Sequence, residues 1–471
     1  MSPTRGFFFS TDSGCEYYYD DYSGNCFIST PGFREALLNH PAPQDSPSLW
    51  RRFIDDRHRG YGAFYGPMRI ATGDIEACKP SLRQLILCLT YRCNLRCRYC
   101  IYSKSYPFSD ADYSGTLLRD TAFAAVRHYM TGVEALLRVN PRQKALISFY
   151  GGEPLLAFEL LQQVVTLTGS YSAIPIEFSV STNGLLLTPA IADYLVGHHF
   201  NIGVSLDGPR EEHDRNRVFR NGRGSFEDAY SNLTALLSRH PTYRRIVLLI
   251  TYDGNTNIPA LRSFLRELPQ ARVKVLLCNA VARVPGSAAE VDVESELWPG
   301  LEQLYREVSR PEVWGEPLVR SLCLHQWFLT VIRPRFVSLG KPGMPYTSSC
   351  VPGDKVCVGP DGAFRICEKV PGLPAFGDVE TGIDLNAIGQ LISRYNRTIQ
   401  LDCSACPVSR LCSQCFARLW TGKDFARPAR TVCSDVVAIT RGQFSRFYSV
   451  LERQPKLWSE LLESADMSVP D

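Results

Sequence analysis

The chain has 471 residues, of which 45% are hydrophobic and 21% are charged, an ordinary composition for a globular protein of two or three domains. Its formal net charge of +3 is nearly neutral and gives no reason to expect a nucleic acid or an acidic membrane as partner. The start, MSPTRGFFFSTDSG, fits neither a signal peptide nor a transit peptide, and no apolar stretch approaches the roughly 20 residues that span a bilayer. We therefore expect a cytoplasmic protein.

The first region, residues 1–80, is aromatic, polar and rich in turns. The runs GFFFSTDSG, CEYYYDDYSG and NCFIST predict three short strands separated by Asp-Ser-Gly and Tyr-Ser-Gly turns. The run PGFREALLNH predicts a helix after them. We treat these 80 residues as a first domain.

The second region, residues 81–285, alternates short apolar runs with amphipathic stretches. Six runs predict strands: RQLILCLT, ALISFYGG, IEFSVSTNG, NIGVSLDG, RRIVLLITYDG and VKVLLCN. Apolar strands that alternate with helices are typical of a parallel sheet covered on both faces. Six of them in about 200 residues favour a partial (β/α)6 barrel of the TIM type over a small doubly wound domain. The predicted fold class is therefore α/β.

Three segments complete the predicted layout. Residues 286–345 are expected to form a mostly helical bridge. Residues 346–440 are rich in cysteine and glycine and poor in long periodic segments, so we expect too little apolar surface for this domain to organise itself without metal. Residues 441–471 are assigned to a C-terminal helix and tail.

Cysteine is the unusual part of the composition. A chain of this length in a reducing compartment does not need disulfides, and its seventeen cysteines cluster, whereas buried structural cysteines would scatter. Clustered thiols favour metal ligation.

Three of these cysteines follow the first predicted strand of the barrel. Cys93, Cys97 and Cys100 have the spacing C-x3-C-x2-C. Soft thiolates select iron–sulfur clusters or zinc, but a structural zinc site needs four ligands. Cys88 lies inside the strand LILCLT, and we interpret it as part of the strand core. Three ligands therefore favour a [4Fe–4S] cluster with one open iron; a zinc knuckle and inert thiols are the alternatives.

This spacing, with the aromatic Tyr99 before the last cysteine, resembles that of the radical S-adenosylmethionine (radical SAM) enzymes. The resemblance implies that the open iron binds S-adenosylmethionine and that reductive cleavage of this cofactor yields a 5′-deoxyadenosyl radical. The run FYGGEPLL resembles the GGEP motif of the family, and STNG, SLDG and HDRNR follow later strands in the family's order. The implied cofactor contacts are Tyr99, Gly151, Gly152, Glu153, Asn183, Ser205, Asp207 and Arg217.

The resemblance also implies roles for some of these residues. The paired glycines allow backbone to approach a ligand closely, and Glu153 accepts a hydrogen bond from an ammonium group. Ser205 and Asp207 are expected near the ribose of the cofactor. Arg217 is expected to pair with its carboxylate.

A second group of cysteines resembles the SPASM extension of peptide-modifying radical SAM enzymes, which carries two auxiliary [4Fe–4S] clusters. With the radical cluster, the resemblance implies three [4Fe–4S] clusters in all. It assigns Cys350, Cys357, Cys367 and Cys415 to auxiliary cluster I, and Cys403, Cys406, Cys412 and Cys433 to auxiliary cluster II. One departure is that Cys412 and Cys415 have two residues between them where the family has three. A zinc ribbon is the competing interpretation.

Enzymes with this extension act mostly on peptides and proteins. The resemblance therefore implies an oxidoreductase that abstracts hydrogen from a ribosomally made precursor peptide and installs a cross-link, with a thioether favoured and a carbon–carbon bond possible. Surplus electrons leave through the auxiliary clusters, and a flavodoxin or ferredoxin is the expected external electron donor. Glu368, directly after a cluster cysteine, is the candidate catalytic residue that takes the proton.

Two alternatives to this function remain open: an anaerobic sulfatase maturase that makes formylglycine, and a zinc or iron–sulfur regulator without turnover. The N-terminal region is open as well. Its strands and helix resemble a small winged-helix-like element that binds the leader of a precursor as an added β-strand. The alternative is a structural cap on the barrel.

Overall fold

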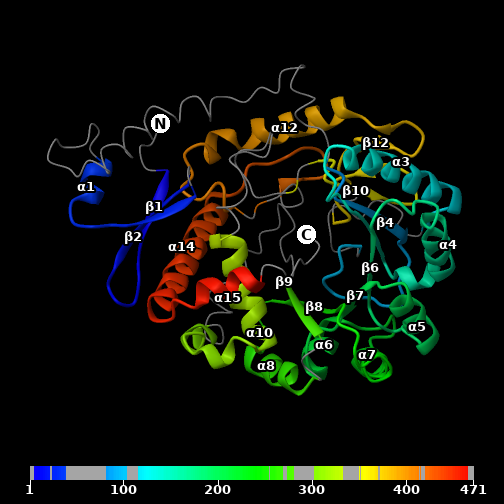
Figure 1. The fold of residues 1–471 in the computed structure, drawn as a ribbon, viewed down its shortest axis with the longest axis horizontal. Helices are drawn as coiled ribbons and strands as arrows, with labels where there is room; N and C mark the ends of the chain where they lie inside the picture. The colour runs from blue at the N-terminus through cyan, green and yellow to red at the C-terminus, as the bar shows by residue number, and fades with distance from the viewer. Residues whose placement is uncertain are drawn as a thin grey trace.

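The computed structural model describes most of the chain. The described residues are 5–21, 24–38, 81–102, 115–253, 255–268, 273–279, 302–332, 350, 352–369, 372–412, 414 and 419–464. Figure 1 shows a large curved sheet with its helices on one side of the molecule and a small N-terminal sheet at the other. The long helix α14 (Arg430–Arg453) lies beside the small sheet.

The large sheet contains the six parallel strands that the sequence predicts. Its order is β11-β10-β4-β5-β6-β7-β8-β9, so the six predicted strands are neighbours in chain order, and each neighbouring pair among them is parallel. Their bounds are β4 (Gln84–Thr90), β5 (Ala145–Gly151), β6 (Ile176–Thr182), β7 (Asn201–Ser205), β8 (Ile246–Tyr252) and β9 (Val273–Asn279). The predicted α/β fold class with a parallel sheet is confirmed.

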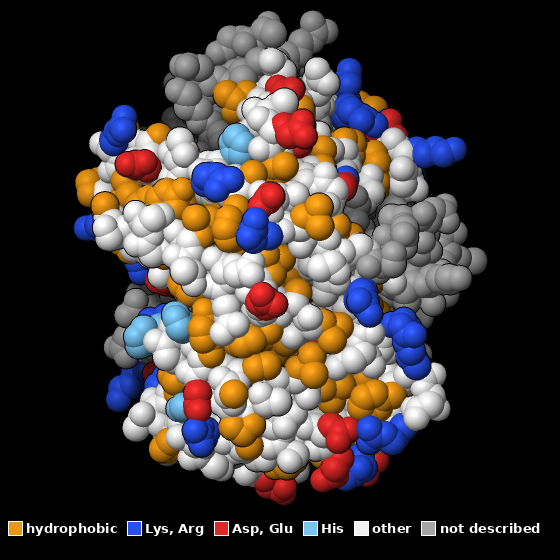
Figure 2. Space-filling model, turned by 90° about the vertical axis from the view of Figure 1, so that its right-hand side faces the viewer, with side chains coloured by type: hydrophobic (Ala, Val, Ile, Leu, Met, Phe, Trp, Pro, Cys, Tyr) orange, Lys and Arg blue, Asp and Glu red, His pale blue; other side chains and the backbone are white. Residues whose placement is uncertain are grey.

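Helices connect these strands and lie along the outer side of the sheet (Figure 1). Their bounds are α3 (Arg119–Leu137), α4 (Phe158–Thr168), α5 (Pro189–Gly197), α6 (Arg210–Asn216), α7 (Phe226–Arg239) and α8 (Ile258–Glu267). On the face that Figure 2 shows, charged side chains of both signs are interspersed with hydrophobic ones. In the described part of the chain, no helix combines the length and the apolar character needed to cross a membrane.

Strand β4 shows why the sheet is buried on both faces. Every second residue from Leu85 to Leu89 is 0% exposed, in the same core as Met130 of α3. Side chains alternate along a strand, so Ile86 and Cys88 face the side away from this helix layer. They are 4% and 1% exposed and pack in a separate small cluster on that side. The continuous apolar run is therefore explained by burial on both faces.

The cysteine-rich region contains more regular structure than the sequence analysis expected. Strand β10 (Lys355–Val358) pairs in parallel with β4, and β11 (Phe364–Arg365) pairs antiparallel with β10. Helix α12 (Leu385–Cys403) has 19 residues and buries an apolar face in the main core. The prediction that this region is poor in long periodic segments is therefore wrong for residues 385–403. A short hairpin, β12 (Gly377–Asp378) and β13 (Gly382–Ile383), precedes α12.

The described part of the predicted bridge, residues 302–332, is largely helical. It includes α10 (Pro317–Val319) and two π-helical segments, Arg320–His325 and Phe328–Ile332. Near the C-terminus, α14 runs across the predicted boundary between residues 440 and 441, and α15 (Leu457–Ser464) follows it. The chain is therefore continuous helix at that boundary.

The small N-terminal sheet has its elements within the runs that predict them. Strands β1 (Gly6–Ser10), β2 (Glu16–Asp20) and β3 (Asn25–Ile28) pair antiparallel in that order, and α1 (Phe33–Leu38) follows. The rest of the predicted first domain, residues 39–80, lies outside the described part of the chain.

This sheet packs into the main core of the protein. Phe7, Phe9 and Tyr19 are each at most 4% exposed, and their rings lie 4.9–5.7 Å from the ring of Phe444 in α14. Aromatic contacts of this kind contribute roughly 0.5–1.5 kcal/mol each beyond the area that they bury. The small sheet is thus part of the folded body.

A buried ion pair fixes the same sheet to the cysteine-rich region. The side chains of Arg5 and Asp21 are both 0% exposed, and Arg5 Nε lies 3.0 Å from Asp21 Oδ2. Asp21 also accepts hydrogen bonds from Ser409 Oγ at 2.8 Å and from the backbone N–H of Arg410 at 3.1 Å. The network ties the N-terminal sheet to the loop at 407–411, between two of the predicted cluster cysteines.

Candidate functional site

Cys93, Cys97 and Cys100 lie on the loop that follows β4, in agreement with the predicted position of this motif after a strand. All three are half-buried. Burial raises the pKa of Cys93 and of Cys97 to about 11, which opposes the thiolate form unless positive charge lies close to the sulfurs. An iron–sulfur cluster supplies such charge. Three soft donors on one loop fit a [4Fe–4S] cluster with one iron left without a protein ligand.

Backbone hydrogen bonds attach this loop to the segment that ends α6. The N–H of Arg96 donates to the carbonyl of Val218 at 2.8 Å, and the N–H of Arg98 donates to that of Asn216 at 3.0 Å. The cysteine loop is therefore held against the loop that follows the fourth parallel strand, β7.

The paired glycines let the end of β5 touch the cysteine loop. Gly151 has φ +131°, and a Cβ there would lie 2.2 Å from the carbonyl oxygen of Thr90. A Cβ on Gly152 would lie 2.3 Å from the carbonyl oxygen of Arg92. The next residue, Glu153, donates its N–H to the same Arg92 oxygen at 2.9 Å. Backbone contact with the cysteine loop thus explains both glycines, in addition to the ligand approach that the sequence suggests.

Glu153 is a buried carboxylate with several donors around it. Its Oε1 accepts from the N–H of Leu155 at 3.0 Å and from Thr182 Oγ1 at 2.8 Å, and its Oε2 accepts from the N–H of Asn183 at 2.7 Å. Burial raises the pKa of Glu153 to about 7, although these hydrogen bonds lower it in part. The carboxyl group is thus rigidly held, with a charge that changes near neutral pH.

This raised pKa predicts a pH-dependent stability that Glu153→Gln removes. The unfolded carboxyl ionises near its model value of 4.5 and the folded one near about 7, so native stability falls as pH rises between those values and is level above about 7. Relative to the glutamine variant, wild type without S-adenosylmethionine should lose stability from about pH 6 to pH 7, by at most about 1.4 kcal/mol per unit. Urea unfolding of both proteins across pH 6–8 measures this. If the free energies of unfolding of the two proteins changed in parallel with pH, the prediction would be wrong.

Asn183 connects the end of β6 with the first cysteine of the loop. Its Nδ2 donates to Asn94 Oδ1 at 2.7 Å and lies 3.8 Å from Cys93 Sγ, while its Oδ1 accepts from the N–H of Leu185 at 3.1 Å. The residue is 7% exposed. The tertiary structure therefore brings this predicted cofactor contact directly to a predicted cluster ligand.

Tyr99, Asp207 and Arg217 also come together. The hydroxyl of Tyr99, on the cysteine loop, donates to Asp207 Oδ2, and Arg217 Nε donates to the same oxygen at 2.9 Å. Asp207 and Arg217 are 2% and 8% exposed. Ser205, the last residue of β7, is half-buried. Arg217 thus binds a carboxylate of the chain itself, which the sequence analysis did not expect.

His213 is a site residue that the sequence analysis missed. Its Nδ1 accepts from the N–H of Asp207 at 3.3 Å, so its Nε2–H donates to Ser225 Oγ at 3.0 Å. Burial lowers the pKa of His213 to about 3 and keeps the ring neutral. The neutral ring therefore holds the backbone of Asp207 in place through this hydrogen bond. It lies in the run HDRNR, but no feature of that run marks its histidine as buried.

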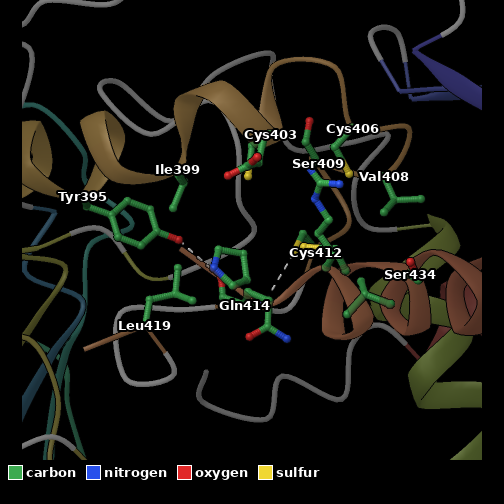
Figure 3. A pocket seen from close by; sticks show the side chains of 15 residues that line it. Tyr395, Ile399, Cys403, Cys406, Val408, Ser409, Cys412, Gln414, Leu419 and Ser434 are labelled. Carbon is green, nitrogen blue, oxygen red and sulfur yellow. Dashed lines mark hydrogen bonds between the residues drawn. The ribbon is translucent and has the colours of Figure 1, made fainter. Parts of the chain in front are cut away.

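Four cysteines of the C-terminal group line one cavity of about 280 Å³ between the end of α12 and the start of α14: Cys403, Cys406, Cys412 and Cys433. Figure 3 shows the first three around this cavity. They are the set assigned to auxiliary cluster II, and four sulfurs are the donor set of a closed [4Fe–4S] cluster. Within the described residues, no three His, Cys, Asp or Glu side chains lie close enough to hold a single metal ion.

The residues assigned to auxiliary cluster I lie around the β10–β11 hairpin. Cys357 in β10 is opposite Arg365 in β11, and Cys367 comes two residues later. Cys357 is 5% exposed, whereas Cys350 and Cys367 are half-buried. Cys415 lies outside the described residues.

Glu368 lies beside the last of these cysteines. The Sγ of Cys367 is 3.5 Å from Glu368 Oε2, and the backbone carbonyl of Glu368 accepts from the hydroxyl of Tyr102 at 3.3 Å. Tyr102 follows the three-cysteine loop by two residues. The candidate proton acceptor is thus next to a predicted cluster ligand and hydrogen-bonded to the end of the first cysteine loop.

The interpretation of Cys88 as part of the strand core is confirmed. It is 1% exposed, as expected, but it faces away from the helix layer and its Sγ lies 3.6 Å from that of Cys357. Hydrogen bonding with Cys88, followed by burial, raises the pKa of Cys357. A strand of the first cysteine region and a strand of the second are therefore in contact through their sulfurs.

Comparison with known proteins agrees with this site. Residues 87–257 match the profile of the radical SAM superfamily. The chain is 26% identical over 190 residues to a cysteine-type anaerobic sulfatase-maturating enzyme of Clostridium novyi (40% of this chain, 48% of the relative). It is 25% identical over 171 residues to the radical SAM cyclopropyl synthase TigE of Paramaledivibacter caminithermalis (36% and 34%). These matches span less than two thirds of the relatives' own length.

Among solved structures, native anSMEcpe with bound AdoMet and the Cp18Cys peptide has a similar fold. Its TM-score is 0.57 at 19% identity, with 81% of this chain and 99% of that chain covered. This similarity supports the α/β architecture over most of the chain. The profile match covers the cysteine loop, the GGE segment and the Tyr99–Asp207–Arg217 group together. Residues 87–257 of the chain therefore form a radical SAM domain.

Proposed function

We propose that this protein is a radical SAM peptide maturase with two auxiliary [4Fe–4S] clusters in a SPASM-type C-terminal region. The observation that carries the proposal is the cavity lined by four cysteines at the end of α12, in a chain whose radical SAM domain ends well before it. The similarity to a sulfatase-maturating enzyme and to TigE supports this class of activity.

In this proposal Cys93, Cys97 and Cys100 hold the radical cluster. When bound and reduced, the cluster and S-adenosylmethionine supply the 5′-deoxyadenosyl radical. Glu153 accepts a hydrogen bond from the amino group of the cofactor, at the position where three donors already fix its carboxylate. Arg217 binds Asp207 through Nε, and its terminal NH2 groups are the donors that we assign to the carboxylate of the cofactor.

The substrate in this proposal is a ribosomally made precursor peptide that receives a cross-link, with a thioether favoured over a carbon–carbon bond. Glu368 takes the proton released on ring closure, because its carboxylate lies beside Cys367. The cysteines assigned to the auxiliary clusters would hold groups that supply a route for the surplus electron, and a flavodoxin or ferredoxin would be the electron donor of the radical cluster.

Formylglycine formation is the second candidate, and the similarity to a cysteine-type sulfatase-maturating enzyme favours it. Mass spectrometry of a co-expressed substrate peptide separates the two. In a peptide without serine, loss of two hydrogens with every sulfur retained supports a cross-link. Loss of the sulfur of a cysteine supports formylglycine.

Anaerobic iron and sulfide analysis tests the proposal as a whole. Three [4Fe–4S] clusters predict about twelve irons and about twelve sulfides per chain. Zinc in stoichiometric amount without sulfide would overturn the proposal and favour the regulator without turnover. An iron content of about four would restrict the protein to the radical cluster.

We also propose that the N-terminal sheet binds the leader of the precursor along β3. In the described part of the chain, β3 is an outer strand that pairs with β2 only. The N–H of Ser29 donates to Glu16 in the neighbouring strand at 2.8 Å, and bonded positions alternate in an antiparallel pair, so the backbone of Ile28 faces away from β2. Ile28 is also 63% exposed. An added strand could use this edge.

Ile28→Pro is expected to weaken leader binding about 10-fold, because proline removes the outward N–H without removing a bond to β2. Fluorescence anisotropy with a labelled leader peptide from a candidate precursor measures the affinity. Ile28→Ala, which keeps the N–H, is the matched control and should stay close to wild type. Equal affinities for wild type and the proline variant would favour the structural cap instead.

A further inference from the structure

We propose that Asp207 is a positioning residue and not a contact of the cofactor: its carboxylate holds Arg217 in the orientation that presents the terminal nitrogens of the guanidinium to the carboxylate of S-adenosylmethionine. The inference rests on the proposed function, which assigns that carboxylate to Arg217. The sequence analysis instead expects Asp207 near the ribose. The geometry that carries the inference is the set of hydrogen bonds that Asp207 already accepts from the chain.

The carboxylate of Asp207 is largely occupied by donors of the protein. Its Oδ2 accepts from the hydroxyl of Tyr99 and, at 2.9 Å, from Arg217 Nε. Its Oδ1 accepts from the backbone N–H of Thr251 in β8 at 2.9 Å. A carboxylate has about four acceptor positions, and these bonds occupy both positions on Oδ2 and one on Oδ1. Because Asp207 is also only 2% exposed, little of its carboxylate is left for a hydroxyl of the ribose.

Arg217 is oriented by this carboxylate. The ion pair uses Nε, and within the described part of the chain the terminal nitrogens of Arg217 donate no hydrogen bond. The guanidinium carbon lies 5.3 Å from the centre of the Tyr99 ring. Since the guanidinium is planar, a bond through Nε and a neighbouring ring restrict the direction of the terminal N–H groups as well. These groups are thus oriented and still available for a second carboxylate.

The same carboxylate connects Arg217 with the cysteine loop. Tyr99 directly precedes the last cysteine of the motif, and both side chains bond to Oδ2 of Asp207. One residue earlier in each segment, the N–H of Arg98 donates to the carbonyl of Asn216 at 3.0 Å. A ligand held by the cysteine loop and by Arg217 together requires a fixed separation of the two, because small displacements of binding groups are costly.

A residue that orients another must itself be fixed. The N–H of Asp207 donates to His213 Nδ1 at 3.3 Å, and His213 Nε2 donates to Ser225 Oγ at 3.0 Å. His213 and Ser225 are both 0% exposed. With the bond from Thr251, Asp207 is therefore held through its backbone and its side chain by buried groups of the barrel.

Asp207→Glu tests this role, because it keeps the charge and moves the carboxylate by one methylene. Equilibrium dialysis of the anaerobically reconstituted protein measures the Kd for S-adenosylmethionine and for its decarboxylated analogue. The ratio of the two Kd values reports how strongly the protein recognises the carboxylate. The variant should lower this ratio about 5-fold, since an arginine bond to a carboxylate depends on geometry, and should change the Kd for the decarboxylated analogue little.

The matched control is Asp193→Glu. Asp193 also pairs with an arginine, Arg239, at 2.6 Å, but this pair connects the outer helices α5 and α7. The control should leave both Kd values unchanged. Affinities are compared at equal iron content, so that any contribution of iron to the ratio is common to wild type and variants.

The outcomes separate this inference from the proposed function. If Asp207→Glu weakened the binding of both compounds by the same factor, Asp207 would contact a part that they share, such as the ribose, and the inference would be wrong. Unchanged Kd values for both compounds would also overturn it. Asp207→Asn, of nearly the same volume as aspartate, is a second variant should the glutamate variant fold poorly, and it should lower the same ratio. A wild-type protein that binds both compounds equally well would instead contradict the assignment of the cofactor carboxylate to Arg217 in the proposed function.

Discussion

Cys97→Ala is expected to abolish production of 5′-deoxyadenosine and to leave about eight of about twelve irons in place. In the proposed function the radical cluster has three protein ligands on one loop, so the loss of one would remove a third of its attachment. The auxiliary sets belong to other segments, and the cavity at the end of α12 contains none of these three cysteines. Chromatography of 5′-deoxyadenosine after chemical reduction, together with iron analysis, measures both effects.

The control for this variant is Cys323→Ala, in a buried position of the helical bridge. It should retain both the iron content and the cleavage of S-adenosylmethionine. Cleavage that continues in the Cys97 variant would remove residues 93–100 from the role proposed for them. Loss of all iron would mean that the three clusters do not assemble independently.

Asp21→Ala is expected to destabilise the protein by about 3–5 kcal/mol, the usual cost of leaving one partner of a buried ion pair behind. The variant removes the carboxylate of Asp21 from beside the buried guanidinium of Arg5, and with it the acceptor of Ser409 Oγ and of the Arg410 N–H. A domain is stable by only about 5–15 kcal/mol, so this loss is large. The unfolding midpoint of the reconstituted protein measures it.

The matched control is Asp12→Ala, which removes an ion pair between the same sheet and α14. Asp12 and its partner Arg453 are 63% and 49% exposed, so its loss should cost less than about 1 kcal/mol. If the unfolding midpoint of the Asp21 variant shifted as little as that of the Asp12 variant, the buried network would not contribute to the stability of the protein. Because this network reaches the loop at 407–411, the Asp21 variant should also lose iron from auxiliary cluster II more readily than the control.

These two variants also bear on the N-terminal region. The sequence suggests a recognition domain that could be removed, whereas the structure packs Phe7, Phe9 and Tyr19 against Phe444. Deletion of the whole region would expose this surface as well as a buried ion pair. A single change at the edge, Ile28→Pro, is therefore the better test of leader binding.

The local sequence pattern was sufficient to predict the parallel strands and the position of the first cysteine loop. Strands buried on both faces need apolar residues at every position, and those of β4 appear as one continuous run, QLILCLT. Ligands of one cluster on one short loop must be close in the chain, so their spacing is visible in the sequence. The same holds for the glycines before Glu153, although the contact that requires them, with Thr90 and Arg92, lies on another loop.

Helix α12 shows a signal that was present but not used. Ile388, Leu391, Ile392, Tyr395 and Ile399 are buried and recur at the spacing of a helical face. Because cysteines lie on both sides of this segment, the sequence analysis attributed its folding to metal binding. A periodicity count over 385–403 would have predicted the helix.

Residue types and their spacing along the chain are enough to identify the chemistry of this protein: soft donors in short loops, at the ends of parallel strands. They do not reveal which distant groups meet. Cys88 and Cys357 are 269 residues apart, Tyr99 and Asp207 are 108 apart, and Ser409 and Asp21 are 388 apart. Such pairs depend on strand register and on the packing of whole elements, because the chain between them leaves their separation free until the core forms.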